Sequence, residues 1–149
     1  MIYLNGKFIP IEQAMVPVLD RGFIFGDGVY EVIPVYSRHP FRLAGHLQRL
    51  RASLDAIRLA NPNDDAGWAR LVRHLIDVNK PDDQSLYLQV TRGVAKRDHA
   101  FPKDVVPSVF MMSNALSMPP REQVEKGVGA ITAADIRWLR CDIKAIALL

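Results

Sequence analysis

The sequence predicts an α+β fold, an antiparallel sheet with two helices. Two observations predict this class: the expected strands are joined mostly by hairpins, and two segments carry apolar residues at three- and four-residue spacing. Helices that alternated regularly with strands would have indicated a doubly wound parallel sheet instead. With 49% hydrophobic and 23% charged residues, the 149-residue chain has the composition of an ordinary globular protein.

The first expected element is a β-hairpin over residues 2–10. Asn5 and Gly6 stand between two apolar runs, and this dipeptide suits a two-residue turn because both central residues need positive φ. Residues 19–28 contain three glycines and two aspartates and are expected to form a loop. An alternating strand should then begin at Val29 and end at Tyr36, weakened at Pro34, which cannot donate a hydrogen bond to a sheet.

Two amphipathic helices are expected next. Residues 41–60 place Leu47, Leu50 and Leu54 at helical spacing. Residues 65–78 carry a second apolar stripe, preceded by the sequence NPNDD, which supplies helix-breaking and capping residues.

The second half of the chain is expected to contribute more strands. Residues 85–93 and 107–114 have the composition of strands, and residues 124–135 are expected to form another. The adjacent prolines at positions 119 and 120 indicate a linker. The expected division is an N-terminal α+β domain over residues 1–116, a linker over 117–121, and the incomplete start of a C-terminal domain over 122–149.

Charge and composition argue against several classes of partner. The 19 Lys and Arg are interleaved with 16 acidic residues, giving a net charge of +3 without the basic run that favours nucleic-acid binding. No apolar stretch reaches the ~20 residues of a membrane-spanning helix, and the first ten residues lack a signal-peptide pattern, so a cytoplasmic protein is expected. Cys141 is the single cysteine and the four histidines lack the spacing of a zinc motif, so neither a disulfide nor a metal site is expected.

Lys144 has unusual neighbours for a lysine. Five apolar residues follow it, whereas an ordinary surface lysine has polar neighbours because its ammonium is strongly hydrated. An apolar pocket favours the neutral amine, which a Schiff-base nucleophile requires. The alternative is a lysine whose stem lies along apolar surface while its head reaches water, and position alone favours this alternative.

Four further residues could bind an anionic ligand. Arg49 flanks the apolar stripe of the first helix, where its guanidinium could donate two parallel hydrogen bonds to a phosphate or simply be solvated. Arg97 and His99 are two residues apart in a loop, so in an extended segment they point the same way and could hold a carboxylate; a merely polar loop tip is the alternative. Tyr30 could direct its hydroxyl at a ligand or be a half-buried strand tyrosine.

Four sequence motifs, in order, resemble those of the class IV pyridoxal-phosphate aminotransferases: LDRGFIFGDGVYEV, HLQRL, YLQVTRGVAKRDHAFP and RWLRCDIK. The resemblance extends from the first hairpin to the last residue and is strongest to the D-amino-acid (D-alanine) aminotransferases. It implies pyridoxal 5′-phosphate as cofactor and a homodimer that exchanges an amino group between a D-amino acid and a 2-oxo acid such as 2-oxoglutarate or pyruvate. Within this class, the pair Arg97 and His99 separates the D-amino-acid enzymes from branched-chain aminotransferases and aminodeoxychorismate lyases, so the resemblance implies a D-substrate.

The resemblance also implies a role for each candidate residue. Lys144 corresponds to the lysine that binds the cofactor through a Schiff base and then moves the proton at the substrate Cα. Arg49 corresponds to the arginine that holds the cofactor phosphate. Tyr30, Arg97 and His99 correspond to the residues that bind the substrate α-carboxylate, the last two supplied by the neighbouring subunit.

Members of this family continue beyond the lysine into a second domain, which supplies the acidic partner of the pyridine nitrogen and completes the phosphate site. The sequence is therefore expected to be a truncated or partly recorded form of such an enzyme. Two alternatives stay open: a branched-chain aminotransferase or aminodeoxychorismate lyase of the same class, and a non-catalytic fragment that acts only through association. Pro34, where some relatives carry a lysine, bears on the side-chain preference and not on the reaction.

Overall fold

The computed structural model describes residues 1–135 and 139–147. Their strands are β1 (Ile2–Leu4), β2 (Lys7–Ile9), β3 (Gly28–Tyr36), β4 (His39–Pro40), β5 (Gln84–Thr91) and β6 (Ser108–Ala115), and their α-helices are α1 (Arg21–Phe25), α2 (Leu43–Ala56), α3 (Asp65–Val78) and α4 (Arg121–Lys126). The strands form one six-stranded sheet in the order β2-β1-β6-β5-β3-β4, and every pair is antiparallel. The predicted α+β class is confirmed.

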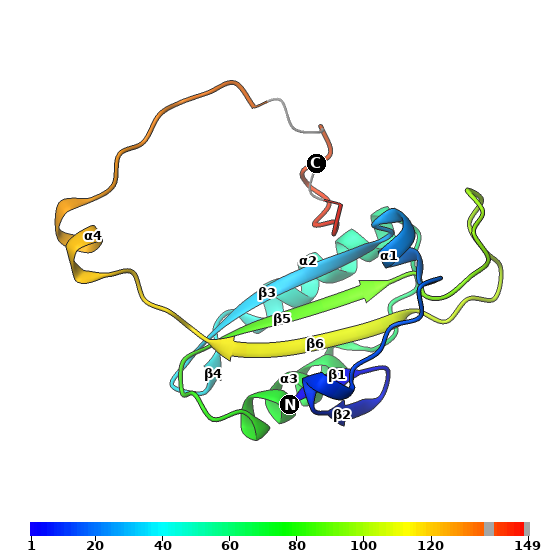
Figure 1. The fold of residues 1–149 in the computed structure, drawn as a ribbon, viewed down its shortest axis with the longest axis horizontal. Coiled ribbons are helices and arrows are strands. Elements are labelled where there is room, and N and C mark those ends of the chain that lie inside the picture. Colours follow the sequence, from blue (N-terminus) through cyan, green and yellow to red (C-terminus); the bar gives the residue numbers. More distant parts are fainter. Residues whose placement is uncertain (136–138, 148–149) are drawn as a thin grey trace.

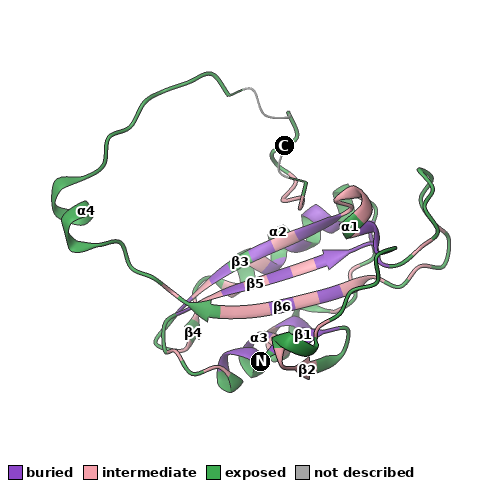
Figure 2. Cartoon of the chain, in the orientation of Figure 1, coloured by how far each residue is buried: buried purple, intermediate pink, exposed green. Residues whose placement is uncertain are grey.

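The hydrophobic core lies between the sheet and the two long helices. In Figure 1, α2 and α3 lie behind the sheet. Side chains alternate along a strand, so one face of β3 and β5 packs on these helices. Figure 2 shows the corresponding alternation of buried and less buried residues along both strands. The fully buried apolar side chains include Ile33, Leu50, Leu54, Trp68, Leu75, Leu86 and Leu88.

The N-terminal hairpin is confirmed. Asn5 and Gly6 have φ values of 46° and 91°, as a turn with positive φ at both central residues requires. The Asn5 carboxamide oxygen accepts a hydrogen bond from the Val109 amide at 2.7 Å, so the turn residue also ties the hairpin to β6.

The two predicted long helices are present. α3 spans the predicted residues 65–78. Asp64 caps its first turn by accepting a hydrogen bond from the Gly67 amide at 2.6 Å. α2 is shorter than the predicted range at both ends. Its first residue follows Arg42, which has φ 51°, and its last turn gives way at Ile57.

β3 tolerates Pro34 because that proline faces the outer edge of the sheet. The Pro34 carbonyl accepts from the Phe41 amide at 2.8 Å, on the side away from β5. In an antiparallel strand the nitrogen of a residue faces the same side as its carbonyl, so no hydrogen bond to β5 is lost.

Residues 21–25 form the short helix α1, where a loop was predicted. The fully buried Asp20 caps it, accepting hydrogen bonds from the Gly22 amide at 2.8 Å and the Ser108 hydroxyl at 2.6 Å. Gly26 ends the helix with a left-handed φ of 63°. A five-residue helix is too short to show apolar periodicity, which is why the pattern missed it.

The strand predicted over residues 124–135 is wrong. Arg121–Lys126 form α4 instead, and residues 127–135 are exposed and have no regular structure. Figure 1 shows residues 116–135 running away from the sheet as a long excursion. The division into a domain, a linker and the start of a second domain stays a prediction.

Within the described residues, no helix combines the length and apolar character needed to cross a bilayer.

Candidate active site

Backbone pairing holds Lys144 at the edge of the sheet. The Tyr30 amide donates to the Lys144 carbonyl at 3.0 Å, and the Ile146 amide donates to the Gly28 carbonyl at 3.0 Å. β4 pairs only with the far end of β3, so the first half of β3 can receive this segment. The chain thereby returns, after the excursion, to a fixed position beside β3.

The Lys144 side chain lies beside Tyr30. Its Nζ is 4.1 Å from the centre of the Tyr30 ring, a cation–π distance. Tyr30 stacks on Tyr87 with 5.6 Å between ring centres, and Tyr87 contacts Phe110 at 6.2 Å. By the alternation of β3, Tyr30 faces away from the helices, while its neighbour Glu31 faces them. The amine therefore ends against a row of aromatic rings on the face of the sheet opposite α2 and α3.

Tyr87, at the centre of this row, is held in its protonated form. Burial, reinforced by the nearby Tyr30, raises the pKa of the Tyr87 hydroxyl. That hydroxyl donates to the Gln89 side-chain oxygen at 2.7 Å. Tyr87 thus adds an uncharged ring to the row beside the lysine.

Arg49 lies on α2 and is fixed by the buried Glu31. Its Nε and Nη2 donate to the two Glu31 carboxylate oxygens at 2.7 and 2.6 Å. His46 Nδ1 lies 2.8 Å from the same carboxylate. The hydrogen bonds to Glu31 raise the pKa of Arg49. Since the Arg49 side chain is 50% exposed while that of Glu31 is 0% exposed, the pair presents an oriented guanidinium to the outside.

Arg49 also lines an open groove of about 420 Å³ between β3 and the start of α2. Arg42 and His46 line it as well, and Val32 and Pro34 form part of its apolar wall. Glu31 already binds Nε and Nη2 of Arg49 and Nδ1 of His46, so the donors left for a phosphate are the Arg42 guanidinium and the remaining nitrogens of Arg49 and His46.

α2 connects the lysine to the arginine. The Lys144 amide donates to the Ser53 hydroxyl at 3.2 Å. Ser53 follows Arg49 by four residues and therefore lies on the same face of the helix. The structure thus brings Lys144, Tyr30 and Arg49 to one edge of β3.

Arg97 and His99 lie elsewhere in the chain. Both are exposed, and both contact Phe25: the Arg97 guanidinium carbon is 5.3 Å from the centre of that ring, and the His99 ring centre is 5.8 Å from it. Among residues 1–135 and 139–147, no hydrogen bond or ring contact joins them to Tyr30 or Lys144. Figure 1 shows their loop, between β5 and β6, projecting beyond the end of the sheet.

Sequence reasoning missed Glu31 and a buried cluster of Arg21, Asp27 and Arg92. Glu31 stands at a position of β3 where the alternation predicts an apolar side chain, and this exception was the available signal. The cluster had no comparable signal, because Arg92 is 65 residues from Asp27 and meets it only through the fold.

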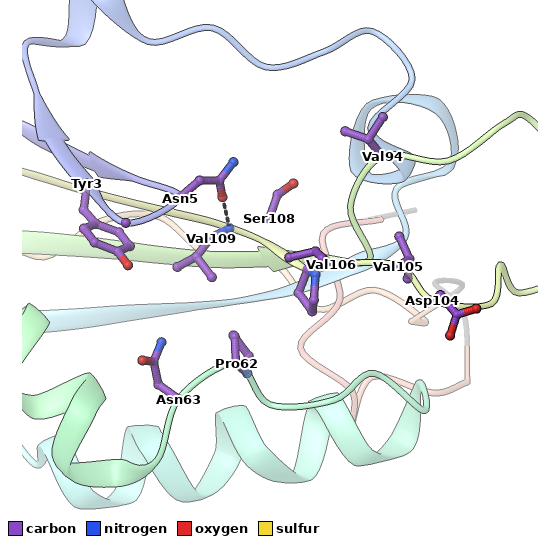
Figure 3. Close-up of a pocket in the computed structure, with 12 residues that line it drawn as sticks. Tyr3, Asn5, Pro62, Asn63, Val94, Asp104, Val105, Val106, Ser108 and Val109 are labelled. Atoms are coloured by element: carbon purple, nitrogen blue, oxygen red, sulfur yellow. Dashed lines mark hydrogen bonds between the residues drawn. The ribbon is translucent and has the colours of Figure 1, made fainter.

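A cavity of about 600 Å³ lies away from all five predicted site residues. Figure 3 shows it between the turn of the first hairpin, Pro62 and Asn63 of the α2–α3 connection, and residues 104–109. Asp104 is the one charged residue in its lining, and Asn5 already accepts the Val109 hydrogen bond. Tyr3, Asn63 and Ser108 are its other polar lining residues, and Ser108 already donates to Asp20.

A family model described as Amino-transferase class IV matches residues 28–149. The chain belongs to the class IV aminotransferases. The matched range begins at the first residue of β3 and includes all five predicted site residues.

The relatives by sequence include the D-alanine aminotransferase of Staphylococcus aureus (strain N315). It is 40% identical over 149 residues, which are 99% of this chain and 52% of that protein. The chain therefore spans about half the length of this class IV relative.

Solved structures of the class share the fold. The branched-chain amino acid aminotransferase of Escherichia coli has a TM-score of 0.73 at 23% identity and covers 77% of this chain and 40% of its own. The 4-amino-4-deoxychorismate lyase of Pseudomonas aeruginosa has a TM-score of 0.69 at 25% identity, and the match covers 86% of this chain and 44% of the lyase chain. Likeness at this level supports the fold and leaves the reaction within the class open.

Proposed function

We propose that this chain carries the lysine-bearing half of a pyridoxal-phosphate-dependent D-amino-acid aminotransferase. The observation that carries the proposal is the position of Lys144, whose amine meets the Tyr30 ring at 4.1 Å while its backbone contacts the helix of Arg49. A reactive amine and an oriented phosphate-binding guanidinium at one edge of a sheet are what a covalently held, phosphorylated cofactor needs.

The residues present fit pyridoxal phosphate. Lys144 would hold its aldehyde carbon, and the groove with Arg42, His46 and Arg49 would hold its phosphate. When bound, the cofactor supplies an electron sink for the charge that develops at the substrate Cα.

The chain's own residues would orient the substrate and move its proton. Lys144 transfers the proton at the substrate Cα as general base and acid. Tyr30 directs its hydroxyl at the substrate carboxylate, while its ring supports the lysine. Glu31 keeps Arg49 in one orientation, so the guanidinium meets the phosphate without reorganising.

Arg97 and His99 would bind the substrate carboxylate of a neighbouring subunit. Within one chain they project from the sheet beside Phe25 and make no contact with Tyr30 or Lys144 in the described residues. A homodimer in which each chain completes the other's site is consistent with this placement. These two residues, together with the D-alanine aminotransferases among the relatives, support a D-amino acid and a 2-oxo acid as substrates.

Covalent capture of the cofactor tests the first part of the proposal. Pyridoxal phosphate is added to the purified 149-residue chain and to a chain extended by the remaining half of the Staphylococcus aureus relative, and the adduct is fixed with borohydride. We expect a mass increase on the peptide of Lys144 that disappears in Lys144→Arg and persists in Lys126→Arg, a control on the exposed helix α4. Capture by the extended chain alone identifies the 149 residues as a non-catalytic piece, and no capture by either refutes the proposal.

Substrate preference tests the second part. D-alanine, L-leucine and aminodeoxychorismate are assayed with whichever chain captures the cofactor, with 2-oxoglutarate as amino acceptor where one is needed. We expect D-alanine to have the highest kcat/KM. Preference for L-leucine or for the lyase reaction would assign the chain to one of the other activities of the class.

A further inference from the structure

Asp27 joins two buried arginines behind the loop that carries Arg97 and His99. Arg21 Nε donates to the Asp27 carboxylate at 2.8 Å. Arg92 donates to both carboxylate oxygens, with Nε at 2.8 Å and Nη2 at 3.0 Å. The side chains of Arg21 and Arg92 are 5% and 4% exposed, so the shared Asp27 carboxylate is needed to compensate their buried positive charges.

Each arginine uses a further part of its side chain to contact the loop. Arg21 Nη1 donates to the Asp98 carbonyl at 2.7 Å, and Asp98 is the residue between Arg97 and His99. The Arg92 guanidinium carbon lies 4.0 Å from the centre of the Phe101 ring. The loop is therefore held at two points, one in the middle of the pair and one just after it.

Phe25 extends this arrangement to the side chains of the pair. The Arg21 guanidinium carbon lies 4.8 Å from the centre of the Phe25 ring, and this ring also contacts Arg97 and His99. Arg21 is thus in contact with the backbone between the two residues and with the ring against which both side chains lie.

An exposed polar loop without such contacts would sample many conformations. A hydrogen bond from a buried guanidinium to a loop carbonyl is charge-assisted and directional, so it restricts the backbone where the pair is attached. The other Arg92 hydrogen bonds, from Nη1 to the Arg58 carbonyl at 3.1 Å and from Nη2 to the Ile57 carbonyl at 2.8 Å, tie the cluster to the end of α2. Through Arg92, the loop is therefore connected to α2, the helix that carries Arg49.

We propose that Arg21 and Arg92, bridged by Asp27, are positioning residues that hold Arg97 and His99 in the geometry needed to bind a substrate carboxylate. The assignment rests on the proposed function, because it gives the loop its ligand. Neither arginine touches the substrate; both act through the loop.

The test compares Arg21→Lys with Arg38→Lys. Lysine keeps the charge at position 21 but cannot reach Asp27 and Asp98 together. Arg38 is a matched control, since it also donates to backbone carbonyls, including that of Ile76 at 2.8 Å, in contacts remote from the loop. Amide hydrogen exchange is measured on the 149-residue chain, and kcat and KM on the chain that shows activity.

We expect Arg21→Lys to speed exchange of the hydrogen-bonded loop amides of Ala95 and Ala100 by about tenfold, the effect of losing one charge-assisted hydrogen bond. We expect the KM for D-alanine to rise by about tenfold or more with a smaller change in kcat, because a misplaced pair weakens substrate binding first. Arg38→Lys should leave both unchanged. Faster exchange with an unchanged KM would refute the positioning role, and unchanged exchange would show that Arg21 does not order the loop.

A second variant keeps the test decisive if Arg21→Lys does not fold. Phe101 is 54% exposed, so Phe101→Ala should fold while losing the contact with Arg92. Faster loop exchange together with a raised KM supports the proposal, and no change in either overturns it. Failure of the proposed function is distinguishable, because the exchange result on the 149-residue chain does not depend on activity.

Discussion

Glu31 is a carboxylate at a position of β3 whose neighbours on the same face, Val29, Ile33 and Val35, are fully buried and apolar. Such a group persists in a core when its hydrogen bonds are satisfied, and Arg49 and His46 satisfy those of Glu31. The charge lies inside the protein while its arginine partner reaches the surface.

Replacing Glu31 by glutamine should lower the free energy of unfolding by about 1–3 kcal/mol, since the amide cannot accept from all three donors. Urea denaturation at neutral pH measures the change. The control is Asp65→Asn, which removes an ion pair between Asp65 and Arg51 whose side chains are 53% and 47% exposed. That pair should contribute under about 1 kcal/mol. An equal effect of both substitutions would contradict the special status of Glu31.

Tyr30→Phe separates the two contributions assigned to Tyr30. The ring and its contact with Lys144 remain, so cofactor capture should be unchanged, while loss of the hydroxyl should raise the KM for the amino acid by about tenfold. Steady-state kinetics and borohydride trapping measure the two effects. A Tyr30→Phe protein with unaltered KM would remove the hydroxyl from the proposed site.

At the residue scale, the sequence predicted the candidates but not their surroundings. Lys144, Tyr30 and Arg49 were identified through motifs, and the structure brings these three together. The carboxylate that orients Arg49 could not be assigned, because its contact with α2 depends on how that helix crosses the sheet. Arg97 and His99 both lie against Phe25, and their pairing as a carboxylate site, with its ligand in a second subunit, stays a prediction.

At the element scale, Gly28 is where β3, β5 and the lysine segment meet. A Cβ at this position would lie 2.6 Å from the Val90 carbonyl oxygen and 3.0 Å from the Thr91 Cα, so backbone would have to move. Gly28 also accepts the hydrogen bond from Ile146.

Gly28→Ala should therefore lower the free energy of unfolding by about 1–3 kcal/mol and slow cofactor capture by Lys144. Gly45→Ala is the control: no atom lies within 4 Å of its added Cβ, and Gly45 is inside α2. This control should stabilise the protein by about 0.5–1 kcal/mol. Urea denaturation tests both variants, whereas the trapping rate is measured for Gly28→Ala only, because Gly45 lines the groove assigned to the phosphate. A neutral Gly28→Ala would show that the strand can shift without consequence.

The elements differ in how far the sequence predicted them. α3 combines an apolar stripe with a clear N-terminal cap, so its bounds were predictable. α1 depends on one buried capping aspartate and on tertiary contacts that no local pattern reveals. Residues 124–135 have the residue types of a strand but pair with no neighbouring strand in the described structure, and the exposed chain forms α4 and irregular backbone instead.

At the scale of the whole molecule, the cluster of Arg21, Asp27 and Arg92 links the end of β5, the loop that carries Arg97 and His99, and α2. Its contribution to the stability of the protein should depend on pH. Burial opposes ionisation of Asp27, but the hydrogen bonds from Arg92 and Arg21 outweigh it, so the pKa of Asp27 is lowered from its usual 3.8. A lowered folded-state pKa gives a stabilising contribution that is present above about pH 4 and is lost as the pH falls through the folded value.

Asp27→Asn removes this contribution. Wild type should be more stable than the variant at pH 7, and the gap should narrow as the pH falls below about 4. Urea midpoints across this range measure it. Asp142→Asn is the control, because the pKa of Asp142 is also lowered by its hydrogen bond from Arg140, but that pair is exposed and screened by solvent. A gap that is constant with pH would contradict the assigned pKa direction.

The proposed homodimer predicts complementation between inactive chains. Lys144→Ala and Arg97→Ala remove residues that should meet across the interface, so a mixed dimer regains one complete site. Equal mixing after joint refolding should restore about one quarter of wild-type activity by statistics. Activity that stays at the level of the separate variants would place both residues in one chain's site.

Residues 144–146 take their place from strand register, since they pair with β3 at its open edge. The irregular stretch 127–135 can therefore gain or lose residues without moving the amine, because slack in an exposed connection is absorbed there. A one-residue slip within 144–146 has the opposite effect, since it turns the lysine to the other face of the sheet. Insertions should accordingly be tolerated within residues 127–135 and should abolish cofactor capture when they fall between Lys144 and Ile146.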